Sequence, residues 1–261
     1  MKKLPISVTI ITKNEEDRLP QTLESVKDWV AEMVVVDSGS DDATVDVAKN
    51  FGAKTYHRDW TGYGEQKYYA EDVASHDWVL NLDADERVLP ELRDEIMALF
   101  ENEDAMADGY FMNIHDRFHG TDRLSKYVPF DAVRLYRKSK GRYSTSPVHD
   151  RVQMHKGSTT ARLKGRLAHD SLRSFAHAID KTNRYTTMQV ADMQAKGRKF
   201  SALRLLLEFP LAFFKGYFVR GYWREGLIGY IYAVNFAYGR FLRQAKLWEA
   251  AKKIVKTNKS I

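Results

Sequence analysis

Hydrophobic positions in the first hundred residues follow two different periods in turn. Residues 6–11 and 33–36 are continuous apolar runs rich in Ile and Val, which is typical of strands buried on both faces. Between these runs, apolar residues recur every three or four positions from Leu19 to Val30, which predicts a helix over residues 14–30. The chain therefore begins with a strand–helix–strand pattern, as expected for a parallel sheet.

The same alternation continues along the chain. Helices are predicted at residues 44–50, 63–75 and 90–100, and strands at 54–57, 78–82, 109–115 and 132–137. From about residue 177 the pattern is helical to the end. The predicted fold is α/β: a single doubly wound, mainly parallel sheet with helices on both faces (residues 1–176), followed by a C-terminal helical region (residues 177–261). In such sheets, ligands bind beyond the carboxyl ends of the strands.

Composition narrows the class of protein. A hydrophobic fraction of 44% and an aromatic fraction of 12% are enough to bury a core, which excludes global disorder. The absence of cysteine excludes disulfides, thiolate metal sites and a cysteine nucleophile, and it fits a reducing compartment. The apolar run at residues 6–11 is short, follows Pro5 and lacks a small-residue cleavage site. We therefore expect a strand there rather than a signal peptide.

Charge is divided unevenly between the two parts of the chain. Residues 181–261 contain 16 basic and 4 acidic residues, a net charge of +12, whereas residues 1–180 carry a net charge of −6. Such asymmetry indicates an anionic partner for the basic end, either a membrane or a nucleic acid.

The basic end also contains a dense run of Leu, Phe, Tyr and Trp between residues 200 and 241. Arg204, Glu208, Pro210 and Lys215 interrupt the best window for a spanning helix, so we expect this region to lie in the interface of an anionic membrane. The side chains expected to insert include Phe213, Phe214 and Trp223. The alternative is a helical subdomain whose aromatics pack on the sheet. Nucleic acid is not expected, because a stacking platform needs aromatics exposed among polar residues.

Two carboxylates follow the strand predicted at residues 78–82. Asp83 and Asp85 are two positions apart, so they are expected to project to the same side. Burying like charges this close is costly unless a cation or hydrogen-bond donors neutralise them. Mg²⁺ binds one or two carboxylates and completes its shell with substrate phosphates, so the pair indicates a metal site for a diphosphate. The alternative is a polar strand end before a helix that begins at Pro90.

Polar clusters also follow the first two predicted strands, at residues 12–16 and 37–42. Asp37 is suited to accept hydrogen bonds from a base edge or a ribose. A turn that caps the next helix explains Gly39 and Asp42, but it does not explain Asp37. The glycine-rich motifs of dinucleotide sites and P-loops are absent from the sequence, which argues against those classes.

Six segments of the sequence carry a family resemblance. Residues 10–16 (IITKNEE), 35–44 (VVDSGSDDAT) and 81–86 (NLDADE) resemble the three signatures of inverting glycosyltransferases of family 2. Residues 59–67 (DWTGYGEQK), 147–150 (PVHD) and 167–170 (LAHD) are similar to a subgroup of that family. The subgroup is the lipopolysaccharide-core β-1,4-glucosyltransferases, which glucosylate the inner-core heptose. The resemblance covers nearly the whole chain and implies a GT-A-like fold.

The resemblance implies a UDP-sugar donor held at the strand ends. It assigns uracil binding to Asp37, a place near the ribose and metal to Asp83, and direct metal ligation to Asp85. The nucleotide-sugar set that it implies comprises Thr12, Asn14, Glu15, Asp37, Ser38, Lys67 and Asp83. The implied cofactor is a divalent metal, Mg²⁺ or Mn²⁺. His169 is a further candidate metal ligand, His149 and His169 are candidate phosphate donors, and a hydrogen-bonded structural role is the alternative for both.

Inverting transfer also needs a general base that deprotonates the acceptor hydroxyl. The candidates are Asp150, Asp131 and Glu86. We favour Asp150, because residues 141–150 contain Gly, Ser and Pro and can form a loop over the site. The family more often has Glu after the Val-His pair, where this chain has Asp150. An ion pair between Asp150 and a neighbouring arginine is the alternative.

Together these features predict metal-dependent, inverting transfer of a hexose, with UDP-glucose as the expected donor. The expected acceptor is a hydroxyl of a lipid-linked or lipopolysaccharide-core glycan, and the expected location is peripheral, on the cytoplasmic face of the cell membrane. Arg134 and Arg137 are expected to share a strand face and to contact acceptor phosphates, unless that face is merely solvated. A sugar nucleotidyltransferase would need a glycine-rich loop after the first strand. A non-enzymatic membrane- or nucleic-acid-binding protein would leave the carboxylates unexplained.

Overall fold

The computed structural model describes residues 3–102, 105–125, 131–145 and 151–258, with side chains up to residue 252. The chain forms two compact units. Residues 1–117 and 128–171 make the first, here called the sheet unit, and residues 118–127 and 172–261 make the second, here called the helical unit.

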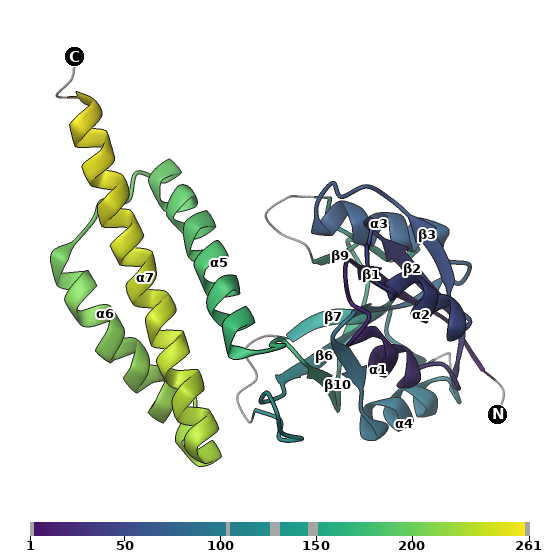
Figure 1. Cartoon of the computed structure of the whole chain (residues 1–261). Coiled ribbons are helices and arrows are strands. Elements are labelled where there is room, and N and C mark those ends of the chain that lie inside the picture. Colours follow the sequence, from purple (N-terminus) through teal and green to yellow (C-terminus); the bar gives the residue numbers. More distant parts are fainter. Residues whose placement is uncertain (1–2, 103–104, 126–130, 146–150, 259–261) are drawn as a thin grey trace. The chain divides into compact units, whose positions relative to one another are not determined.

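One half of the main sheet is parallel (Figure 1). Its strands lie in the order β3 (Lys54–His57), β2 (Val30–Asp37), β1 (Leu4–Thr12) and β4 (Trp78–Asp83). The helices that follow the first three strands are α1 (Leu19–Glu24), α2 (Thr44–Asn50) and α3 (Tyr63–Val73). Because β1 lies between β2 and β4, the chain reverses its winding direction at β1. The carboxyl end of β1 is therefore the topological switch point, where doubly wound sheets bind ligands.

The other half of the sheet is mixed. β7 (Asp131–Arg137) is antiparallel to both β4 and β6 (Gly109–Asp116), whereas β10 (Thr160–His169) is parallel to β6. β5 (Glu86–Val88) closes this edge as an antiparallel partner of β10. β8 (Gly141–Tyr143) and β9 (Val152–Met154) form a separate hairpin-like pair. Four of the seven pairings in the eight-stranded sheet are parallel, so the predicted α/β fold with a mainly parallel sheet is confirmed.

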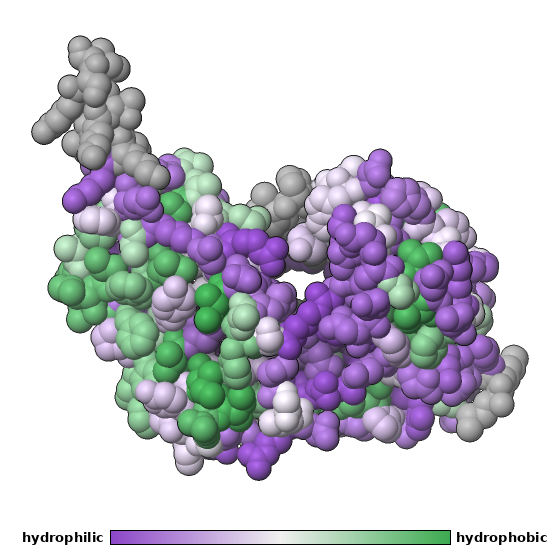
Figure 2. Space-filling model, viewed as in Figure 1, coloured by the Kyte–Doolittle hydropathy of each residue, from purple (hydrophilic) through white to green (hydrophobic). Residues whose placement is uncertain are grey.

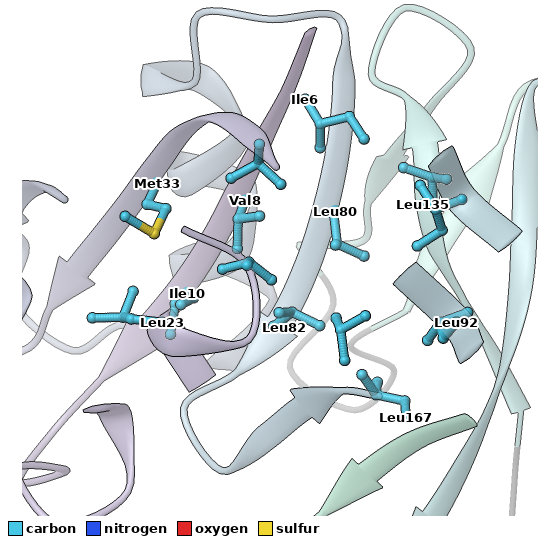
Figure 3. Packing of buried hydrophobic residues seen from close by; sticks show 14 of the residues in the cluster. Ile6, Val8, Ile10, Leu23, Met33, Leu80, Leu82, Leu92, Leu135 and Leu167 are labelled. Atoms are coloured by element: carbon cyan, nitrogen blue, oxygen red, sulfur yellow. The ribbon is translucent and has the colours of Figure 1, made fainter. Parts of the chain in front are cut away.

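The largest core cluster lies on the face of the sheet covered by α1 and α4 (Pro90–Leu99). Figure 3 shows Ile6, Val8 and Ile10 of β1 beside Leu80 and Leu82 of β4. All five side chains are fully buried, and each contributes about 1.5–3 kcal/mol relative to exposure. α4 lies so close to β10 that a Cβ at Gly165 would stand 2.4 Å from Cα of Leu92, so only glycine fits there.

The helix expected over residues 14–30 is wrong in its extent, since α1 covers only Leu19–Glu24. Asn14 has a φ of +56°, a left-handed conformation that a helix cannot contain. Pro20 lies in the first helical turn, the position where its missing N–H costs nothing. Residues 25–29 form turns, and Val26 is nevertheless buried. The spacing of apolar residues is therefore the same for a short helix followed by tight turns as for one long helix.

The helical unit contains α5 (Phe175–Ala195), α6 (Ala202–Phe214) and the long α7 (Gly226–Asn258). A π-helical turn (Lys215–Val219) and a 3₁₀ turn (Tyr222–Glu225) connect α6 to α7. The hydroxyls of Ser174 and Ser201 cap the first turns of α5 and α6. α7 packs against both other helices, as Figure 1 shows. In the described part of the chain, every helix is too short or too polar to cross a bilayer.

Candidate active site

The carboxyl ends of β2, β1 and β4 bring the predicted strand-end clusters together. Thr12 pairs in register with Asp37, and Ile11 with Asp83. Because these three strands are adjacent and parallel, their last residues meet at one edge of the sheet. The nucleotide-site candidates among residues 12–15, 37–38 and 83 therefore lie at the switch point.

Asp37 is buried at the end of β2, and its carboxylate holds the turn that follows. It accepts hydrogen bonds from the backbone N–H groups of Gly39 (2.9 Å) and Ser40 (2.7 Å). The hydroxyls of Thr12 (3.0 Å) and Ser40 (2.5 Å) donate to its other oxygen. The sequence argument that a turn leaves Asp37 unexplained is therefore wrong. The two hydroxyls can rotate, so the carboxylate retains capacity for an external donor.

The loop after β1 is tied to the loop after β2 through backbone and side-chain bonds. The N–H of Asn14 donates to Oγ of Ser40 (2.8 Å), and Oδ1 of Asn14 accepts from the N–H of Asp41 (3.0 Å). The N–H of Glu15 donates to Oγ1 of Thr44 (2.7 Å). Asparagine tolerates the left-handed backbone conformation that this connection requires.

Ser38 is also buried at this edge. Its hydroxyl accepts a hydrogen bond from Nε2 of Gln66 (2.8 Å), which belongs to α3. The backbone N–H of Ser38 donates to the carbonyl of Thr12 (3.0 Å). Ser38 thus joins β1, β2 and α3 at the switch point.

Lys67 of α3 is buried and forms an ion pair with Asp83 at 2.8 Å. Its ammonium also lies 5.1 Å from the ring centroid of Tyr143. Burial alone would lower the pKa of Lys67, but the neighbouring Asp83 outweighs burial and raises it. Lys67 is therefore a fixed positive charge beside the strand end.

Arg134 of β7 is the main site residue that the sequence analysis misplaced. It is buried, and its guanidinium donates to Asn81 (2.8 Å), Asp83 (3.0 Å) and Glu86 (2.7 Å). Arg134 and Arg137 are three positions apart, so they lie on opposite faces of the strand, and the shared-face expectation was wrong. An arginine in the middle of an otherwise buried strand was the signal that could have revealed this role.

The charge of Asp83 is consequently neutralised from within the protein. Burial would raise the pKa of Asp83, but Lys67 and Arg134 hold it well below its usual range. Burial raises the pKa of Glu86, although Arg134 opposes the change. Glu86 also accepts from the N–H of Asp83 (2.9 Å), which fixes the turn after β4.

Asp85 has a different set of neighbours. Its Oδ2 accepts from the guanidinium of Arg18 (2.8 Å), and its Oδ1 lies 3.6 Å from Nε2 of His169. Arg18 also forms an ion pair with Glu15 at 2.7 Å. Nδ1 of His169 bonds Asp116 at 2.8 Å. Burial would lower the pKa of His169, but Asp116 and Asp85 raise it to about 9.

The donors at Asp85 fit a divalent metal that shares its shell with a diphosphate. Oδ1 of Asp85 and Nε2 of His169 are close enough to bind one ion, which would displace the Nε2 proton of His169 while Asp116 keeps the other proton on Nδ1. Within the described residues, no cluster of three or more His, Asp or Glu side chains is suited to a metal. Asp85 and His169 would be the ligands from the described residues, with substrate phosphates and water completing the shell.

The three candidates for the general base differ in what the structure shows of them. Asp150 lies outside the described residues. Glu86 is buried and held by Arg134, and Asp131 forms an ion pair with Arg162. Glu86 is therefore enclosed, whereas Asp131 is an exposed carboxylate that is ion-paired.

The doubly wound α/β sheet with a polar, charge-lined switch point is typical of enzymes that bind their ligands at the carboxyl ends of the strands. The sequence model described as "Glycosyl transferase family 2" matches residues 7–162. The chain belongs to glycosyl transferase family 2 and is a glycosyltransferase.

Two curated relatives are similar over nearly the full length of both chains. An uncharacterized glycosyltransferase of Rickettsia typhi is 38% identical over 97% of this chain and 89% of its own. The lipopolysaccharide core biosynthesis glycosyltransferase LpsC of Rhizobium meliloti is 32% identical over 95% of this chain and 93% of its own.

Solved structures show more distant likeness. TarS of S. aureus matches 70% of this chain and 39% of its own, with 16% identity and a TM-score of 0.46. A glucosyl-3-phosphoglycerate synthase from Mycobacterium tuberculosis, in complex with Mn²⁺, UDP and glucosyl-3-phosphoglycerate, matches 43% of this chain and 44% of its own. That match has 24% identity and a TM-score of 0.35.

Proposed function

We propose that this glycosyltransferase transfers a hexose, with glucose from UDP-glucose as the first donor to test, to a hydroxyl of a lipopolysaccharide-core or other lipid-linked glycan. Transfer inverts the anomeric centre and depends on Mg²⁺ or Mn²⁺. The observation that carries the proposal is the convergence of Asp85 and His169, 3.6 Å apart, beside the neutralised Asp83 at the switch point. Similarity to LpsC supports the acceptor class.

The donor is held by residues from three strand ends and α3. Asp37 and Ser38 receive the uracil, with Thr12, Asn14 and Glu15 shaping the adjoining loop. Asp83, fixed by Lys67 and Arg134, faces the ribose.

Asp85 and His169 would hold the metal, which would neutralise the diphosphate leaving group as a Lewis acid. Arg18 occupies the second oxygen of Asp85 and so leaves Oδ1 for the ion. The acceptor proton goes to a carboxylate on the opposite side of the sugar, and Asp150 is the proposed base.

A donor screen tests this proposal. The protein is incubated with UDP-glucose, UDP-galactose or UDP-N-acetylglucosamine, with Mn²⁺ and a lipopolysaccharide-core acceptor, and released UDP is measured. We expect metal-dependent UDP release with one of these donors. Release of pyrophosphate from a sugar phosphate and UTP, without UDP release, would indicate a nucleotidyltransferase and contradict the proposal.

Asp37→Ala is expected to weaken UDP binding by about 1.5–3 kcal/mol, the range for a hydrogen bond to a charged group, which is about 10- to 150-fold. Calorimetric titration with UDP measures the change. Ser40→Ala is the control, since it removes a donor within the turn but keeps the carboxylate. An equal loss of UDP affinity in the two variants would indicate that Asp37 has a purely structural role.

Asp150→Asn is expected to keep UDP and metal binding but to lower kcat by about 10²–10⁴-fold, because the amide keeps the shape but cannot accept a proton. Single-turnover kinetics and a UDP titration separate these effects. Near-normal kcat would pass the role to Asp131. Lost UDP binding would instead indicate the ion-pair role.

A further inference from the structure

The outer side of α6 is apolar and exposed. Residues 203, 207, 211 and 214 follow one another at spacings of four, four and three, so they share one side of the helix, and the exposed Phe218 follows in the π-helical turn. We call this surface the α6 face. Its members are Leu203, Leu206, Leu207, Leu211, Phe214 and Phe218, with exposed fractions between 44% and 72%. Figure 2 shows hydrophobic side chains gathered over the helical unit, whereas the visible side of the sheet unit is mainly hydrophilic.

The opposite side of α6 packs on α7. Ala212 and Gly216 are buried there, and Glu208 bonds Arg243 (3.1 Å) and Gln244 (3.0 Å) of α7. The acidic side chain of α6 is thus turned toward a neighbouring helix while six large apolar side chains face outward. This is the reverse of the pattern of a surface helix in water.

Cations border the α6 face. Residues 196–224 contain seven basic residues and one acidic residue, which is Glu208. The exposed basic side chains in this segment include Arg198, Lys199, Arg204, Lys215 and Arg224. The segment that carries the apolar surface is therefore rich in exposed positive charge, and it has no exposed acidic residue.

An anionic membrane matches both properties. Apolar side chains can enter the boundary between headgroups and acyl chains, while Lys and Arg extend to the anionic headgroups. A second copy of this chain fits less well, because pairing two α6 faces would bring the exposed cations of both segments close together. We propose that the α6 face inserts into the interface of an anionic membrane and holds the enzyme there. This inference rests on the proposed function, because membrane binding would bring the enzyme to a lipid-linked acceptor.

The structure also changes which side chains are expected to insert. Phe213 is stacked on Tyr217, with ring centroids 5.3 Å apart, and it also contacts Tyr230, so it belongs to the packing within the unit. Phe214 and Trp223 are exposed, as an inserting role requires. The leucines of α6 contribute more apolar surface than the sequence analysis assigned to them.

The test compares two triple variants of the full chain. Leu203→Gln/Leu206→Gln/Leu211→Gln makes the α6 face polar. Ile179→Gln/Tyr185→Gln/Met188→Gln is the matched control, because these side chains are exposed on α5. We measure co-sedimentation with vesicles of phosphatidylglycerol and phosphatidylcholine at low and high salt. The α6 variant should bind at least about tenfold more weakly, and the control should bind like wild type. High salt should release the wild type only in part.

Several outcomes overturn the inference. They are a wild-type protein that does not bind anionic vesicles at low salt, an equal loss of vesicle binding in both variants, or a wild-type dimer that becomes a monomer in the α6 variant. UDP titration with Mn²⁺ in the absence of vesicles separates this inference from the proposed function. Unchanged UDP affinity with lost vesicle binding supports the α6 face, whereas absent UDP binding with intact vesicle binding contradicts the proposed donor alone.

Discussion

Arg134→Met is expected to lower the free energy of unfolding by about 3–5 kcal/mol, the range for removing one partner of a buried ion pair. Arg134 is the shared partner of Asp83 and Glu86, and the buried Glu86 cannot reach water without disturbing the strand end. Urea denaturation measures the loss. Arg166→Met is the control, since the Arg166–Glu91 pair is exposed and should contribute at most about 1 kcal/mol.

The loss should also depend on pH. Burial raises the pKa of Glu86, and removing Arg134 raises it further. A carboxylate with a raised folded pKa destabilises the fold above its unfolded pKa, and the penalty disappears as pH falls through the folded pKa. The difference in the free energy of unfolding between Arg134→Met and wild type should therefore become smaller from neutral to mildly acidic pH. Adding Glu86→Gln to the Arg134→Met variant should reduce the same difference at neutral pH. A variant as stable as wild type would contradict the buried network.

Asp85→Ala is expected to abolish metal-dependent transfer while leaving the fold intact. The variant loses one of the two proposed metal ligands, and Arg18 keeps its ion pair with Glu15. Because a Lewis acid supplies several kcal/mol in such reactions, kcat should fall at least about 100-fold. UDP release with Mn²⁺ measures kcat. Asp77→Ala is the control, because Asp77 precedes β4 at the other end of the sheet. Wild-type turnover in Asp85→Ala would contradict the metal site.

The convergence of the candidate residues at one edge of the sheet was predictable from the sequence because its signals are local. Buried strands ended by Asp37, Asp83 and Asp85 can be read from the hydropathy pattern, and parallel strands place their carboxyl ends at one edge. The contacts of Arg134 could not be read in this way. They depend on β7 lying antiparallel to β4, a pairing between segments separated by about fifty residues in the chain.

The separation of Asp83 from Asp85 was likewise hidden in the sequence. Their spacing predicts a shared environment, yet Asp83 pairs with Lys67 and Arg134, and Asp85 with Arg18. The cations that neutralise these carboxylates come from α3, β7 and the loop before α1. Only the tertiary structure determines which cation reaches which carboxylate.

The central claim is that Asp85 holds a metal that binds the donor diphosphate, and calorimetric titration of UDP tests it most directly. Wild-type protein is titrated in Mn²⁺ and again in EDTA, and Asp85→Ala is titrated in Mn²⁺. We predict tight binding for wild type in Mn²⁺ and at least about tenfold weaker binding in the other two titrations. Equal UDP affinity in all three titrations, or no UDP binding by wild type in Mn²⁺, would contradict the account.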